Sequence, residues 1–289
     1  MFTRLVRLAP LAALVLALAC SAAEPPRRYQ FTGLVLAVHP DRREITIRHD
    51  DIEGLMPAMT MSFPVTDVAL LDGRVAGDVV TGTLDVSDAI GRISALTKTG
   101  TAPLPTDSNA VALAEGLLDV GDEVPDAALI DQTDTRRSLS EWRGTPTLVT
   151  FIYTACPLPT FCPLMDQNFA MIQRAVAEDP ALAGRVRLVS ISFDPDRDTP
   201  AVLAAHAARL QADPAVWTWL TGDRVTVDRV AARFGVGVVR QGEAAGGEIT
   251  HNLRTVLVGA DGRVAAIYSG NEWTPGRVLT DLRAAVIPR

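Results

Sequence analysis

Residues 147–163 read TLVTFIYTACPLPTFCP, and this stretch decides the fold of the second half of the chain. Its apolar, β-branched start predicts a buried strand, and Pro163 suits the beginning of a helix because proline has no N–H to lose there. The intervening loop carries Cys156 and Cys162. Two thiols are therefore expected at the C-terminal end of a strand, the edge of an open α/β sheet where ligands bind.

These two cysteines have two alternative uses. A structural disulfide would close only a small loop and would add little stability. A helix N-terminus, in contrast, stabilises a thiolate relative to a thiol. The pattern therefore favours a metal or redox site over a structural disulfide.

The first twenty residues are typical of an exported protein. Arg4 and Arg7 precede an apolar run at 8–18, and the sequence ALAC at 17–20 resembles a bacterial lipobox. We predict a signal peptide over 1–19, cleavage before Cys20 and lipidation of its sulfur; the alternative is a plain signal peptide with an incidental cysteine. The mature chain would then be anchored in the bacterial cell envelope and face the periplasm.

The composition is that of a globular protein, with 48% hydrophobic and 21% charged residues. Removal of Arg4 and Arg7 with the signal peptide takes the formal net charge from −7 to −9. This acidity argues against nucleic acid as a partner. With Cys20 lipidated, the two remaining thiols would tend to oxidise outside the cytoplasm, so a thioredoxin-like reductant is an expected partner.

The rest of the chain divides by pattern. Residues 20–28 read as a tether, and five strand-like runs within 29–98 predict a small all-β, OB-like barrel. Residues 99–116 gather Pro, Gly, Ser and Thr and read as a linker. From 117 to 289, alternating strands and helices predict an α/β, thioredoxin-like domain. The predicted elements there are strands at 147–153, 185–193 and 217–220, helices at 163–178, from 199, at 225–234 and from 274, and a hairpin at 254–270.

His251 bears on the choice between redox chemistry and metal binding. It stands three residues before the strand at Arg254, so in such a fold it would lie at the sheet edge facing the cysteine loop. Two thiolates and one imidazole suit Cu(I), because soft sulfur ligands select a soft ion. His39 and His206 receive no assigned role.

Four motifs in order over about residues 117–287 resemble the Sco/SenC family of copper-binding, thioredoxin-fold proteins, which help assemble the copper centre of cytochrome c oxidase. The motifs are FIYTACPLPTFCPLM (151–165), SFDPDRDTPAVL (192–203), LTGD (220–223) and ITHNLRTVLVGADGRV (249–264).

This resemblance implies a ligand set of Cys156, Cys162 and His251, and it matches Asp194 and Asp198 to the family's acidic motif. The usual family spacing places three residues between the cysteines, whereas this chain has five. The longer loop can still bring the two sulfurs together, because a bis-thiolate site needs only close Cα atoms.

A second cluster lies within the predicted barrel, where Met56, Met59 and Met61 are three of the chain's six methionines. Met59 and Met61 would share one face of a strand, and His49 would lie on the corresponding face of the preceding strand. Two thioethers and an imidazole suit Cu(I) or Ag(I). The alternative is that these methionines fill the core.

This segment also resembles the periplasmic copper- and silver-binding CusF-like domain, whose motif has a histidine followed by Met-x-Met. The resemblance implies a site at His49, Met59 and Met61. Met56, where such domains can carry a tryptophan, adds a further thioether.

We therefore predict a copper metallochaperone rather than an enzyme, with an oxidase subunit or another copper acceptor as its client. The two sites would form a relay, since a flexible linker of roughly eighteen residues spans about 23–25 Å. One alternative is a thiol–disulfide oxidoreductase acting on cysteines of an oxidase subunit. The other is a copper-sequestering resistance protein without a delivery role.

Overall fold

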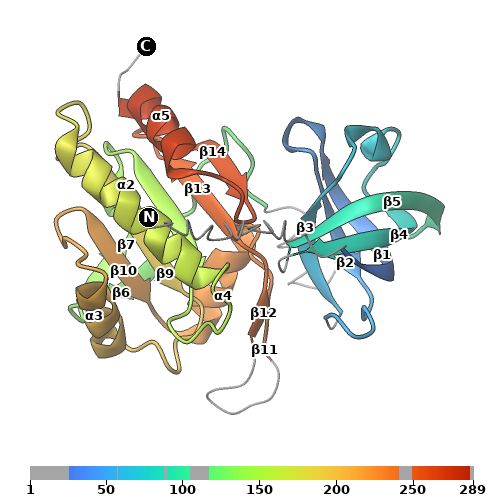
Figure 1. Ribbon diagram of the computed structural model, residues 1–289, viewed down its shortest axis with the longest axis horizontal. Coiled ribbons are helices and arrows are strands. Elements are labelled where there is room, and N and C mark those ends of the chain that lie inside the picture. Colours follow the sequence, from blue (N-terminus) through green and yellow to red (C-terminus); the bar gives the residue numbers. More distant parts are fainter. Residues whose placement is uncertain (1–25, 57, 88–89, 105–116, 241–248, 287–289) are drawn as a thin grey trace, which may run out of the picture.

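The computed structural model describes residues 26–56, 58–87, 90–104, 117–240 and 249–286. The predicted signal peptide, Cys20 and most of the predicted linker lie outside these ranges, so lipidation stays a prediction. In the part of the chain that is described, no helix is long and apolar enough to cross a membrane. Two bodies, each built on its own sheet and core, lie side by side (Figure 1).

The N-terminal body is a curled antiparallel sheet with the strand order β3-β2-β1-β4-β5. A single bridge between Val65 and Ile93 brings its two edges together, so it is OB-like without a continuous closing ladder. Short 3₁₀ helices occupy Pro40–Arg42 and Val68–Leu71. The strands are β1 (Arg27–His39), β2 (Glu44–His49), β3 (Met59–Pro64), β4 (Asp78–Ser87) and β5 (Ile90–Thr101).

Alternation along the strands produces this body's core. Residues on one face of each strand point inward because successive side chains alternate between faces. Phe31, Val35, Ile45, Ile47 and Phe63 are all buried there. The alternation of apolar and polar residues in the sequence predicts this buried cluster on one face of the sheet.

The C-terminal body is a seven-stranded mixed sheet with the order β14-β13-β8-β9-β10-β6-β7. β8 pairs in parallel with β9, and β9 pairs in parallel with β10. The strands are β6 (Ala128–Asp131), β7 (Arg136–Ser138), β8 (Thr147–Ile152), β9 (Arg187–Ser192), β10 (Trp217–Thr221), β13 (Arg254–Val258) and β14 (Val264–Ser269).

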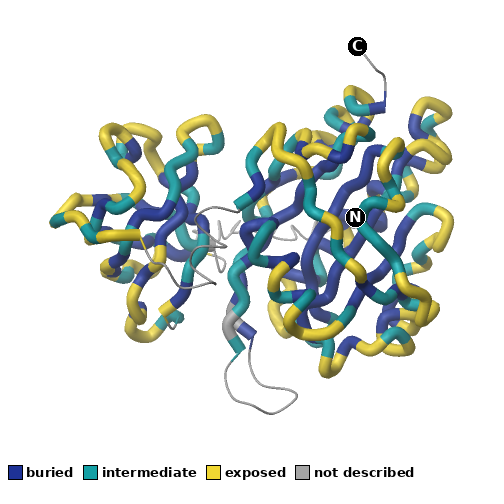
Figure 2. Tube along the Cα trace, turned by 180° about the vertical axis from the view of Figure 1, so that it is seen from behind, coloured by how far each residue is buried: buried dark blue, intermediate teal, exposed yellow. Residues whose placement is uncertain are grey.

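β8 is the centre of this body, and all six of its residues are buried. Helices cover both faces of a parallel sheet, so such a strand reads as a continuous apolar run rather than an alternating one. Figure 2 shows the buried segments running through the strands, with exposed residues on the surrounding turns.

Helices α2 and α5 pack side by side over the sheet (Figure 1). Phe234, just after α4, packs on Phe151 of β8 with ring centroids 5.2 Å apart. The helices are α2 (Cys162–Glu178), α3 (Pro200–Arg209), α4 (Arg224–Arg233) and α5 (Pro275–Val286), with a 3₁₀ helix at Leu139–Trp142.

The element boundaries differ from the predicted ones at a few places. α2 begins at Cys162, one residue before Pro163. β1 begins at Arg27, inside the stretch read as a tether, and β5 runs on to Thr101, inside the stretch read as a linker. Two short antiparallel pairs were not predicted individually. One is β6 with β7, and the other is a ribbon of β11 (Val238–Arg240) and β12 (Ile249–His251).

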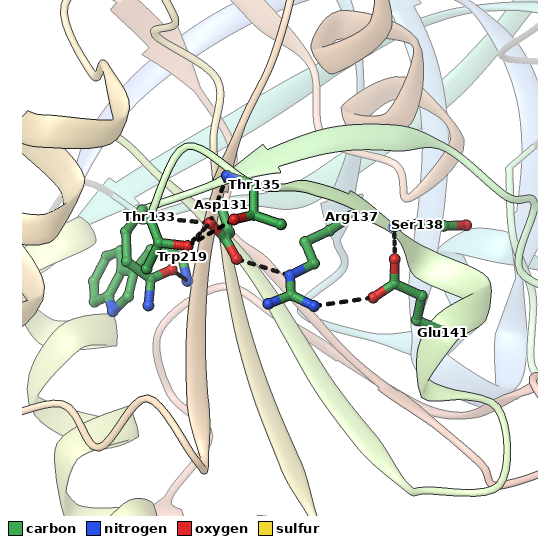
Figure 3. Close-up of polar contacts among 8 residues, drawn as sticks. Asp131, Thr133, Thr135, Arg137, Ser138, Glu141 and Trp219 are labelled. Carbon is green, nitrogen blue, oxygen red and sulfur yellow. Dashed lines mark hydrogen bonds and ion pairs between the residues drawn. The ribbon is translucent and has the colours of Figure 1, made fainter.

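Asp131 organises the turn between β6 and β7 (Figure 3). Its Oδ1 accepts hydrogen bonds from the backbone N–H groups of Thr133 at 2.8 Å and Thr135 at 3.0 Å, and its Oδ2 accepts from Arg137 Nε at 2.7 Å. Burial alone would raise the pKa of Asp131, but these donors together lower it. The cluster is an internally satisfied edge of the sheet and not a site.

Candidate metal centre

The cysteine loop lies at the C-terminal end of β8, as the sequence predicts. β8 ends at Ile152 and α2 begins at Cys162, so Cys156 lies in the loop while Cys162 occupies the first turn of the helix. Cys162 is buried and Cys156 is half-buried, and both are free thiols. The five intervening residues still allow the two sulfurs to approach each other.

Asp198 holds the start of this loop. Its carboxylate accepts hydrogen bonds from the Thr154 backbone N–H at 2.9 Å and the Ser192 hydroxyl at 2.6 Å, and also from the Thr154 hydroxyl. Asp198 is completely buried. Thr199, not Asp198, is the N-cap of α3. Asp198 therefore ties the cysteine loop to the end of β9.

His251 closes the cluster from the opposite side. It ends β12, where its backbone pairs with Val238 of β11, and its Nε2 lies 3.9 Å from Cys162 Sγ. The donor atoms of Cys156, Cys162 and His251 all lie within 4.8 Å of one another. The structure thus brings together the three residues that the sequence singles out.

The hydrogen bonding of His251 fixes which ring nitrogen is available. Nδ1 lies 3.0 Å from the carbonyl oxygen of Asn252, so it carries the proton and donates. The lone pair of Nε2 is then left facing the cysteine side. An imidazole oriented by such a backbone contact is the usual arrangement of a metal-binding histidine.

Three aromatic rings enclose His251. Its centroid lies 5.7 Å from Tyr153, 5.5 Å from Phe161 and 4.7 Å from Phe193. These rings limit the motion of the imidazole. Sequence reasoning missed this enclosure, because an aromatic residue at a strand end gives no separate signal for a site.

The two thiols have opposite acidities. A hydrogen bond from Cys162 holds the pKa of the Cys156 thiol well below its usual range. Burial raises the pKa of Cys162, and the negative charge of Cys156 adds to this effect. At Cys162, burial therefore opposes the stabilisation of a thiolate that a helix N-terminus is expected to give. The metal-free pair holds one thiolate and one thiol at neutral pH.

The barrel cluster also assembles. His49 on β2 is the direct cross-strand partner of Met59 on β3, and Ile47 is the partner of Met61. Met56 and Met61 pack partly buried against the barrel core. The side chains of one face of an antiparallel pair lie adjacent, so His49 and Met59 lie side by side, and Met61 follows on the same face of β3.

The imidazole of His49 has one unused nitrogen. Nδ1 lies 2.7 Å from the Asp50 carbonyl oxygen and donates to it, while the buried Nε2 has no hydrogen-bond partner among the described residues. His49 is 1% exposed. Burial lowers its pKa, so the ring is neutral and Nε2 offers a lone pair. A buried nitrogen without a partner is costly unless a ligand occupies it.

A buried pair behind the cysteine helix was not recognised from the sequence. His206 Nε2 lies 2.8 Å from Asp166 Oδ2, and the ring meets Trp219 edge-on at 4.9 Å. Asp166 lies on α2, one turn after Cys162, and burial raises its pKa. The contact fastens α3 to α2. A histidine among alanines on a helix gives no sequence signal for this role.

Comparison with known proteins follows the same division of the chain. Residues 120–286 match the family described as SCO1/SenC. The chain belongs to the SCO1/SenC family. Residues 28–98 match the family described as copper binding periplasmic protein CusF. The protein is thus a SCO1/SenC protein with a CusF-like domain, as its motifs predict.

Individual relatives agree with the family match. The SCO1 protein homolog of Bacillus subtilis is 29% identical over 56% of this chain and 82% of its own length. A SCO1/SenC family lipoprotein from Bacillus anthracis has a structure with a TM-score of 0.51 and 24% identity, covering 57% of this chain and 95% of that one. The copper-bound ScoI structure of Bradyrhizobium japonicum has a TM-score of 0.48 and 27% identity, covering 58% of this chain and 99% of that one.

The family match and the Bacillus anthracis structure confirm the thioredoxin-like fold of the C-terminal body. The two family matches confirm the predicted copper cofactor. The CusF description is that of a periplasmic protein, which indicates a cell-envelope location for this SCO1/SenC protein.

Proposed function

We propose that this SCO1/SenC protein is a lipid-anchored copper metallochaperone that binds Cu(I) through Cys156, Cys162 and His251. The observation that carries the proposal is the convergence of these three donor atoms within 4.8 Å of one another. Two sulfurs and one imidazole form a soft, low-coordinate set for Cu(I). The enclosing aromatic rings would shield the bound ion from water and oxidants.

The barrel supplies a second proposed copper site at His49, Met56, Met59 and Met61. The unpartnered Nε2 of His49 supports it, because a metal would supply the interaction that the protein does not. Thioethers need no deprotonation and cannot form disulfides. The barrel would therefore keep its affinity for copper in either redox state of the cysteines.

Delivery is the proposed purpose of this binding. The chain would present copper at the periplasmic face of the membrane to an oxidase subunit or another copper acceptor, for assembly of the copper centre of cytochrome c oxidase. A thioredoxin-like reductant would keep the cysteines available. Family membership and a half-buried, accessible Cys156 support this role.

The test measures copper on the reduced mature protein by competition with a Cu(I) chelator and by thiolate-to-copper absorption. We expect Cys156→Ser or Cys162→Ser to abolish the absorption band and His251→Ala to weaken affinity. His39→Asn is the matched control, because this histidine contacts Asp119 and belongs to neither proposed site. Full affinity in Cys156→Ser would overturn the ligand assignment.

A second candidate function is thiol–disulfide exchange. The observation that favours it is the lowered pKa of Cys156 beside the buried thiol of Cys162, which resembles an attacking and a resolving cysteine. Equilibration of the purified protein with glutathione buffers, followed by reduction of a peptide disulfide, separates the two functions. Turnover in the absence of copper would favour exchange over delivery.

A further inference from the structure

One cavity between the bodies is lined by residues of both proposed copper sites. This cavity of about 90 Å³ is lined from the barrel by Met56 and Met61 and from the other body by Phe161 and His251. A cavity of this size exceeds the share of liquid volume that one water molecule occupies, about 30 Å³. His251 is thus both a member of the three-donor cluster and a wall of the cavity that holds two barrel methionines.

The backbones of the two bodies touch beside this cavity. A Cβ atom added at Gly237, just before β11, would lie 2.5 Å from the carbonyl oxygen of Thr60 and 3.0 Å from Met59 Cε. Its three nearest neighbours all belong to β3. Only a residue without a side chain permits this approach, which sets a copper-site strand of the barrel against the ribbon that carries His251.

Ion pairs hold the bodies around the contact. Glu44 of β2 and Arg254 of β13 are almost fully buried, and their charged groups lie 3.7 Å apart. Arg42 contacts Asp119, and Arg92 contacts Glu272 nearer the surface. The Glu44–Arg254 pair therefore joins the two bodies at a place from which water is excluded.

We propose that the two bodies of one chain stay docked and that copper passes directly from one body to the other. Cu(I) on the barrel methionines would cross the shared cavity to His251 and pass from there to the two cysteines. This inference rests on the proposed copper sites. It goes beyond them because copper would pass between docked bodies, and neither body would have to move on a flexible linker. The facing walls of the cavity already hold a donor and an acceptor ligand.

The step is a ligand exchange without a change in oxidation state. Cu–S(thioether) bonds and the His49 nitrogen bond break, while bonds to the His251 nitrogen and two thiolate sulfurs form. Any proton that a thiol still carries is released to solvent as its sulfur binds Cu(I). The products carry negative charge on the sulfurs next to Cu(I), so transfer to the reduced pair runs downhill. A disulfide offers no such ligands, and transfer then stops.

The experiment loads the full mature chain with one equivalent of Cu(I) while the cysteines form a disulfide, so that copper occupies the barrel. A phosphine reductant then opens the disulfide, and thiolate-to-copper absorption reports arrival at the cysteines. Thiol labelling gives the rate of disulfide reduction. In wild type we expect a transfer rate that is independent of protein concentration, because donor and acceptor lie within one molecule.

Gly237→Ala is the decisive variant, since its methyl group meets the barrel. We expect transfer at least about tenfold slower than wild type, because a Cβ atom at 3.0 Å or less from the barrel strand disrupts docking. The matched control is Gly276→Ala, where an added Cβ meets nothing within 4 Å. It should transfer as wild type does.

Reversing the charges of the Arg92–Glu272 ion pair gives a second test of the transfer rate. Arg92→Glu should slow transfer by repelling Glu272, and Arg92→Glu combined with Glu272→Arg should restore it. The docked route is overturned by a wild-type rate proportional to protein concentration, or by an unchanged rate in Gly237→Ala. Failure of either site to bind copper at equilibrium would instead overturn the proposed function.

Discussion

At the scale of single residues, the two cysteines are chemically unequal. Cys156 is half-buried with a lowered pKa, whereas Cys162 is buried with a raised one. Their positions in the sequence do not by themselves suggest such a difference. It arises because one thiol donates a hydrogen bond to the other, and the inner position disfavours charge.

This inequality predicts the number of protons that copper displaces. Cys156 is already ionised at neutral pH, so only Cys162 has to lose a proton when Cu(I) binds. We expect the apparent affinity to rise about tenfold per pH unit near neutrality and to fall as pH decreases. Chelator competition at several pH values measures the slope. A hundredfold change per unit would mean that both thiols start protonated.

At the scale of elements, the pairing of β2 with β3 creates the barrel cluster. The register sets His49 opposite Met59, and a slip of one residue would turn the set to the other face. The cluster is therefore a property of the strand pair and not of either strand alone.

This pairing predicts how many Cu(I) ions each body binds. Met59→Ile combined with Met61→Ile should lower the reduced protein from two Cu(I) per chain to one, and the disulfide form from one to none. Ile keeps a similar apolar volume but has no sulfur. Met171→Ile on the exposed side of α2 is the control. Copper retained by the oxidised double variant would exclude Met59 and Met61 as ligands.

Asp198 follows β9, the strand beside β8, and bonds the start of the cysteine loop. We therefore expect the metal site to depend on this carboxylate. Asp198→Asn leaves fewer acceptors for Thr154 and Ser192, which should cost about 1–3 kcal/mol of stability and loosen the cysteine loop. Copper affinity should fall with it. The exposed Asp196→Asn is the matched control, and urea unfolding with chelator competition measures both effects. Unchanged affinity would show that the loop holds its shape without this carboxylate.

At the scale of the molecule, the buried pair of Glu44 and Arg254 links the two bodies. Glu44→Gln leaves the Arg254 guanidinium buried without its carboxylate, and we expect destabilisation of about 3–5 kcal/mol. Glu44→Leu combined with Arg254→Met should recover most of this loss, because two apolar side chains leave no unpaired charge. Urea unfolding measures both variants. Equal losses in the single and double variants would show that the two charges are not coupled.

Most of the architecture could be predicted from the sequence because it rests on local patterns. The continuous apolar run before Cys156 specifies a central strand, alternation specifies the barrel strands, and Asp261-Gly262 specifies the turn between β13 and β14. The short pairs β6 with β7 and β11 with β12 were missed, since each strand has too few residues to show a period.

The sequence by itself determined the candidate donor residues, their order along the chain and the two folds that carry them, because periodicity and donor chemistry are local properties. Only the tertiary structure decided the enclosure of His251, the acidity of each thiol, the unused Nε2 of His49 and the cavity shared by the two bodies. These features depend on residues far apart in sequence. Glu44 and Arg254 are separated by most of the chain, and they form an ion pair only because folding buries their charged groups 3.7 Å apart.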